Sequence, residues 1–141
     1  MAVSFSYQVP HFRVRGKKNI VQWILAVAFV ERKEVEKIHF IFCNDEFIRE
    51  INKEFLRHNT PTDIITFSES NENRITAEIY ISVEHVRENS KYYDVPFCNE
   101  LHRVIVHGIL HCCGHDDKSQ KEKRLMRKME DEWLQRLSSF K

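Results

Sequence analysis

Alternation between apolar and polar residues marks the first strand expected in this chain, over residues 3–9. The run 38–43 is short, apolar and rich in β-branched and aromatic residues, which predicts a buried strand. Two further strands are predicted over 63–67 and 75–81. The polar segment 68–74 between them is short, so we expect these two strands to pair antiparallel.

Five other segments carry apolar residues at the three- and four-residue spacing of a helix. They cover residues 20–32, 44–55, 82–92, 99–113 and 119–137. Four of them begin at a residue that can cap a helix: Asn44, Ser82, Asn99 and Ser119. The order of strands and helices predicts an α+β fold, with a small mixed four-stranded sheet packed against about five helices. We expect residues 1–141 to form a single domain.

Composition is that of a soluble globular protein, with 42% hydrophobic and 30% charged residues. The net charge of +1 does not by itself indicate a nucleic-acid partner. The first six residues lack the basic start and long apolar core of a signal peptide, and the apolar stretch 20–30 is about half a membrane span. The four cysteines show no metal-binding spacing, so we expect buried, reduced thiols. These features favour a cytoplasmic protein without a membrane partner.

The strongest chemical signal is a pair of histidines, His107 and His111, four residues apart in an apolar helical segment. Residues at this spacing share one face of a helix, so both imidazoles can point at one metal ion. Gly114 follows and can end the helix in a left-handed conformation, which would turn the next residues back towards that ion. His115, Asp116 or Asp117 could then be a third ligand. Two imidazoles, a third ligand and a position left to water are the plan of a catalytic zinc site.

The spacing of these ligands is similar to that of metzincin proteases, but Gly108 stands where those enzymes have a general-base glutamate. The sequence His107-Gly-x-Leu-His-x2-Gly-x-Asp116 more closely resembles the signature of the YbeY family, bacterial metal-dependent endoribonucleases of ribosomal RNA maturation. Two upstream segments, 51–67 and 77–82, are also similar to blocks of that family, in the same order.

The resemblance implies roles for individual residues. Arg57 corresponds to an arginine near the metal, where a guanidinium could hold a phosphate bidentately. The family usually has a histidine at the third ligand position, which Asp117 occupies here, six residues after the second histidine. We therefore expect His107, His111 and Asp117 to bind the metal, with His115 as the alternative to Asp117. Glu78 and Glu100 are candidate acceptors for the imidazole N–H groups.

The function implied is zinc-dependent cleavage of single-stranded RNA during ribosomal RNA maturation, with Arg57, His107 and His111 as catalytic residues. One ion is expected, and nickel or iron would also suit the ligands. The implied partners are ribosomal RNA and the small ribosomal subunit, with no role for DNA. Two alternatives remain: a ribosome-assembly factor whose metal site is closed and structural, and a zinc protease, which Gly108 disfavours.

Overall fold

The computed structural model describes residues 2–55 and 62–140 of the chain. The elements alternate between strands and helices up to β3, β4 follows β3 directly, and the rest of the chain is helical. In chain order they are β1 (Val3–Tyr7), α1 (Lys17–Val30), β2 (Glu34–Cys43), α2 (Asp45–Phe55), β3 (Ile64–Ser68), β4 (Arg74–Ser82), α3 (Val83–Tyr92), α4 (Phe97–Cys112), α5 (Gln120–Leu137) and a 3-10 turn (Ser138–Phe140).

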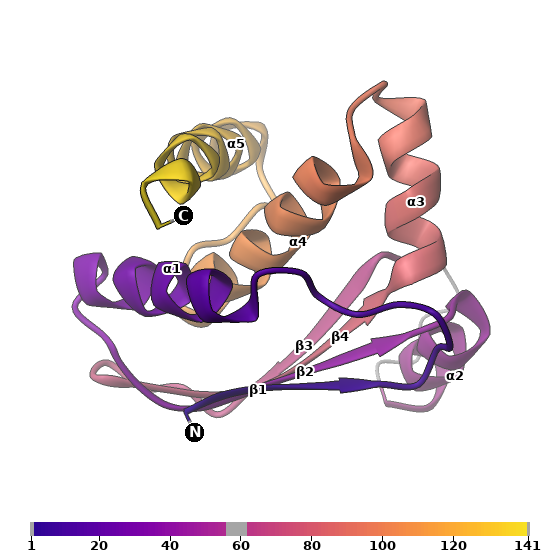
Figure 1. The fold of residues 1–141 in the computed structure, drawn as a ribbon. Coiled ribbons are helices and arrows are strands. Elements are labelled where there is room, and N and C mark those ends of the chain that lie inside the picture. Colours follow the sequence, from indigo (N-terminus) through magenta and orange to yellow (C-terminus); the bar gives the residue numbers. More distant parts are fainter. Residues whose placement is uncertain (1, 56–61, 141) are drawn as a thin grey trace.

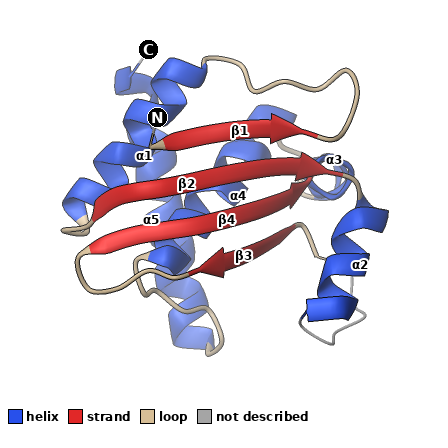
Figure 2. Cartoon of the chain, turned by 90° about the horizontal axis from the view of Figure 1, so that it is seen from below, coloured by secondary structure: helices blue, strands red, loops and turns tan. Residues whose placement is uncertain are grey.

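The four strands form one mixed sheet in the order β1-β2-β4-β3, as Figure 2 shows. β1 pairs parallel with β2, and β2 pairs parallel with β4. β3 pairs antiparallel with β4, with Ile65 opposite Tyr80, and so forms one edge of the sheet. The predicted α+β class, the mixed four-stranded sheet and the antiparallel pair are confirmed.

Helices lie on both faces of the sheet but cover them unequally. Figure 1 shows α1 and α4 over one face, with α5 farther from the sheet. The main core lies in this layer and contains the inward-facing residues of β4, such as Ile79, and of α4, such as Ile105 and Ile109. On the other face, Ile48 and Ile51 of α2 pack in a small second cluster with Ile65.

Close packing of α4 on the sheet explains the glycine between the two histidines. A Cβ atom at Gly108 would lie 2.9 Å from Ile64 Cδ1 and 3.4 Å from Ile79 Cδ1. Any larger residue would therefore push the helix or Ile64 away, since interiors have little free volume. Because position 108 faces the sheet, a glutamate there would not point at the histidines from the open side of the helix.

Several helix caps were predicted correctly. Asn44 Oδ1 accepts from the Phe47 backbone N–H at 2.9 Å, and Ser82 Oγ accepts from the His85 N–H at 3.2 Å. Ser119 forms the expected capping box with Glu122 at the start of α5. These interactions involve residues close in sequence, which explains why the sequence was sufficient to predict them.

Other boundaries were predicted wrongly. Asn99 does not cap α4, because the helix begins earlier: the Pro96 carbonyl accepts from the N–H groups of Asn99 and Glu100 at 3.1 and 3.3 Å. β2 begins at Glu34, four residues before the apolar run, since its exposed first half still pairs with β4. An apolar run marks the buried part of a strand and leaves its exposed hydrogen-bonded part unmarked.

The four cysteines are free, as expected. Cys43 and Cys112 are buried, and burial raises their pKa values to about 12 and about 11. Cys98 is exposed, so the expectation of buried thiols is wrong at that position.

No helix in the described ranges is both long and apolar enough to cross a membrane.

Candidate metal centre

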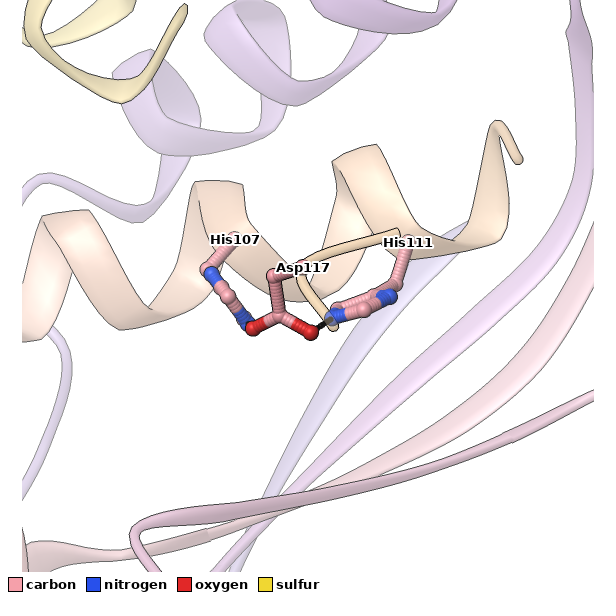
Figure 3. A group of neighbouring side chains, drawn as sticks. All are labelled: His107, His111 and Asp117. Carbon is pink, nitrogen blue, oxygen red and sulfur yellow. Dashed lines mark ion pairs between the residues drawn. The ribbon is translucent and has the colours of Figure 1, made fainter. Parts of the chain in front are cut away.

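His107 and His111 project from the same face of α4, one turn apart (Figure 3). Their ring centroids are 4.6 Å apart, with the ring planes at 74°. The opposite face of this helix is buried in the main core. The helix therefore holds both imidazoles at a fixed spacing on a rigid element.

The chain reverses direction directly after this helix, and the reversal depends on Gly114. Gly114 has φ of +100°, and its N–H donates to the His111 carbonyl at 3.0 Å, while the His115 N–H donates to the Leu110 carbonyl at 3.1 Å. These two bonds define a Schellman ending, in which a left-handed residue follows the helix. The role predicted for Gly114 is thus confirmed.

The reversal places the Asp117 carboxylate between the two imidazoles. Asp117 Oδ2 lies 3.4 Å from His107 Nε2, and Oδ1 lies 3.4 Å from His111 Nε2. Figure 3 shows the carboxylate facing both rings. The three residues each offer one ligand atom, and these atoms lie within 4.8 Å of one another.

The spacing of these atoms fits a small divalent cation. Bonds of about 2.0–2.1 Å in tetrahedral geometry place neighbouring ligand atoms about 3.3 Å apart. Each imidazole has one Asp117 oxygen close to this distance, Oδ2 at 3.4 Å for His107 and Oδ1 at 3.4 Å for His111. His107, His111 and Asp117 could therefore hold a metal ion; that they are its ligands stays a prediction.

His115, the alternative third ligand, lies in a different environment. Its Nε2 atom is 2.6 Å from Glu31 Oε1, at the end of α1. This contact joins the loop after α4 to α1 and directs the imidazole away from the group formed with Asp117. The arrangement agrees with the expected preference for Asp117 over His115.

Glu130 of α5 is the residue that orients His107, and sequence reasoning missed it. His107 Nδ1 lies 2.6 Å from Glu130 Oε2, which leaves Nε2 facing Asp117. The Glu130 side chain is only 7% exposed, and its other oxygen accepts from Arg103 Nη1 at 2.9 Å. Arg103 also donates to Asp131 at 2.6 Å. A carboxylate that accepts from the distal nitrogen of a metal-binding histidine fixes its orientation and its tautomer.

Among residues 2–55 and 62–140, neither of the two candidate glutamates accepts a hydrogen bond from an imidazole. Glu78 is exposed, and it alternates along β4 with the buried Ala77 and Ile79, so it lies on the sheet face away from α4. Glu100 is buried on α4, but Glu130 is the acceptor for His107. A signal for Glu130 was present, since it is an acidic residue within the predicted apolar stripe of α5.

The electrostatic environment separates the two histidines. Burial lowers the pKa of His107, but the hydrogen bond and charge of Glu130, together with Asp117 and Asp63, raise it overall above its usual value. Burial and the neighbouring charge of His107 lower the pKa of His111, and Asp117 opposes this only in part. Without a cation, His107 is thus the better proton acceptor, whereas His111 favours the neutral form that binds metals.

Two cavities meet at the triad formed by His107, His111 and Asp117. One, of about 420 Å³, lies between α3, α4 and α5, and the other, of about 600 Å³, lies along β3. Both are lined by Asp63, His107 and Asp117. Burial raises the pKa of Asp63, although the charges of His85 and His107 oppose the shift. Asp63 was not singled out from the sequence, where it resembled only the first residue of a strand.

Arg57 lies outside the described residues, so its predicted place near the metal stays a prediction.

Known proteins resemble this chain over most of its length. The family model described as Endoribonuclease YbeY matches residues 6–138. A Flavobacterium psychrophilum protein named Endoribonuclease YbeY is 44% identical over 132 residues, which are 94% of each chain. A Bacteroides fragilis protein of the same name is 43% identical over 118 residues, covering 84% of this chain and 85% of its own. A solution structure of a Thermotoga maritima protein has a TM-score of 0.67 and 25% identity, covering 96% of this chain and 88% of its own. The chain therefore belongs to the Endoribonuclease YbeY family.

Proposed function

We propose that this protein is a metal-dependent endoribonuclease that cleaves single-stranded RNA. The observation that carries this proposal is the His107–His111–Asp117 group, which lies where two cavities meet, in a chain that matches an endoribonuclease family over most of its length. Zinc suits two imidazoles and a carboxylate, and nickel or iron would also suit them.

Each part of the site has a role in this reaction. His107, His111 and Asp117 would hold the cation, which when bound would supply Lewis-acid activation of water and of the attacked phosphate group. Glu130 keeps His107 Nε2 turned towards the cation by accepting from Nδ1. Arg57 positions the phosphate, as the family resemblance implies.

Asp63 is the group best placed to accept a proton. Asp63 lines both cavities together with His107, and burial raises the pKa of its carboxyl, which makes the carboxylate a stronger base. No glutamate follows His107 in this chain, and His115 is engaged by Glu31. Asp63 is therefore the candidate proton acceptor.

A ribosomal role follows from the family resemblance. We propose that the substrate is ribosomal RNA of the small subunit, cleaved during maturation in the cytoplasm, and that DNA is not a substrate. The recessed position of the triad supports the choice of single strands, because a phosphate flanked by unpaired, splayed nucleotides can enter a cavity that a duplex cannot.

The alternatives are less well supported. A structural metal site would have four protein ligands, but within residues 2–55 and 62–140 the group contains three, which leaves a position for water or substrate. A protease would need a general base next to His107, and Gly108 packs against Ile64 and Ile79 instead.

The experiment that tests the proposal measures metal content and RNA cleavage together. The zinc-loaded protein should cleave a single-stranded RNA oligonucleotide and leave its duplex and its DNA counterpart intact. His107→Ala combined with His111→Ala should abolish both metal binding and cleavage. His11→Ala, which changes an exposed histidine distant in sequence from the triad, should retain both. Unchanged metal content in the double variant would refute the ligand assignment. A wild-type protein that binds zinc but cleaves no RNA would refute the activity.

A further inference from the structure

The cavity between α3, α4 and α5 lies directly beside the triad. Its volume of about 420 Å³ is within the range of roughly 300–1,000 Å³ found for small-molecule sites. His107 and Asp117 form part of its wall, and they also line the cavity along β3. An RNA strand with one phosphate at the triad would therefore have a recess on each side for the adjoining nucleosides.

The charges around this cavity favour a base over a second phosphate. Asp63 and Glu100 line it, and Glu100 is only 6% exposed. Arg103 also lines it, but its guanidinium is already paired with Glu130 and Asp131. Lys123 and Arg127 are exposed and lie one turn apart on α5 at the cavity. A phosphate inside would meet acidic groups, whereas a phosphate outside would meet the exposed cations. The arrangement thus suits a nucleotide whose base enters while its backbone stays outside.

An aromatic ring is available to contact such a base. Tyr93 follows the last residue of α3, lines the cavity and is 53% exposed. Asn89 lies one turn earlier on the same face and donates from Nδ2 to Asp63 Oδ2 at 3.3 Å, so its carbonyl oxygen can accept from a ligand. Exposed aromatic rings are the usual stacking platforms for unpaired bases.

We propose that this cavity is a nucleobase subsite next to the cleaved phosphate, with Tyr93 stacking on the base and Glu100 selecting guanine. The subsite rests on the proposed ribonuclease function and defines its substrate preference. Guanine presents two adjacent N–H donors on its Watson–Crick edge, which a carboxylate accepts with its two oxygens. Uracil presents one N–H between two carbonyl oxygens, which carboxylates repel.

The experiment compares two RNA decamers, one of uridine only and one with a single central guanosine. The wild-type zinc-loaded protein should cleave the second with a kcat/KM about tenfold higher, at a bond next to the guanosine. Glu100→Gln should bring this ratio towards one, because an amide presents a donor beside its acceptor. Tyr93→Ala should lower kcat/KM about tenfold or more for both decamers, and Tyr93→Phe should restore it.

Tyr92→Ala is the matched control. Tyr92 is 81% exposed, and its ring contacts that of Tyr93 edge-on, with the ring centroids 5.0 Å apart. Tyr92 does not line the cavity. Equal losses in Tyr92→Ala and Tyr93→Ala, or a wild-type protein indifferent to guanosine, would overturn the subsite. Binding of fluorescein-labelled decamers to the metal-free variants gives the same comparison without cleavage. An inactive protein that still prefers the guanosine decamer would refute the proposed function alone.

Discussion

Glu130 offers the sharpest test of how this site is held together. The Glu130→Ala substitution removes the acceptor of the His107 Nδ1 contact and one of the two partners of Arg103. Loss of such an outer carboxylate typically weakens metal binding by about 10- to 100-fold, which corresponds to about 1.4–2.8 kcal/mol. Arg103 keeps its 2.6 Å contact with Asp131, so we expect the metal-free protein to lose only about 1–3 kcal/mol of unfolding free energy.

The assay is a competitive zinc titration against a chelator, with thermal unfolding of the metal-free protein measured in parallel. Glu130→Gln should weaken zinc binding less than Glu130→Ala, because an amide oxygen can still accept from His107. It should nevertheless lower the pKa of His107 in the metal-free protein, since only the charges of Asp117 and Asp63 then oppose the effect of burial. Glu132→Ala, at an exposed residue two positions along α5, should match the wild type. Parental zinc affinity in Glu130→Ala would refute the orienting role.

Three further outcomes are expected. Asp117→Asn should reduce zinc affinity more than His115→Ala, and the reverse order in a zinc titration would exchange their roles. Arg57→Ala should retain zinc by elemental analysis but lose RNA cleavage by at least about tenfold; cleavage at the parental rate would exclude Arg57 from catalysis. Burial and then the charge of Asp63 raise the pKa of Glu100 above its ordinary value of 4.5. The contribution of the protonated Glu100 to stability is therefore complete at low pH and is lost as pH rises through the raised pKa of the folded protein. Glu100→Gln should therefore raise Tm at pH 7.5 and do so less at pH 4.5, whereas an equal change at both values would contradict this.

Local sequence was sufficient for the parts of the site that local geometry determines. The spacing of His107 and His111 fixed a shared helix face, and Gly114 predicted the reversal that brings Asp117 back to them. These relations extend over eleven residues and depend only on helix periodicity and on the φ values open to glycine. The strand pattern was similarly informative, because alternation follows burial directly.

Contacts between distant segments were beyond such reasoning. Glu130 follows His107 by 23 residues, and their contact depends on how α5 crosses α4, which periodicity does not specify. The direction of Glu78, on the sheet face away from α4, was also not predicted, because a family match gives position in sequence and not the direction of a side chain. The tie between His115 and Glu31 spans 84 residues and likewise had no signal in the local pattern.

As a third ligand, the Asp117 carboxylate would change the balance of charge at this site. Asp117 reaches both imidazoles with its two oxygens, so the three groups are held near their binding geometry before a cation arrives. This preorganisation favours binding, since little conformational freedom is left to lose. The negative charge also makes a bound cation a weaker Lewis acid than three neutral imidazoles would, and Glu130 adds to the effect through His107. Arg103 counteracts part of it by pairing with Glu130 at 2.9 Å. The pairing of Arg103 with Glu130 would therefore affect the acidity of a bound cation as well as the orientation of His107.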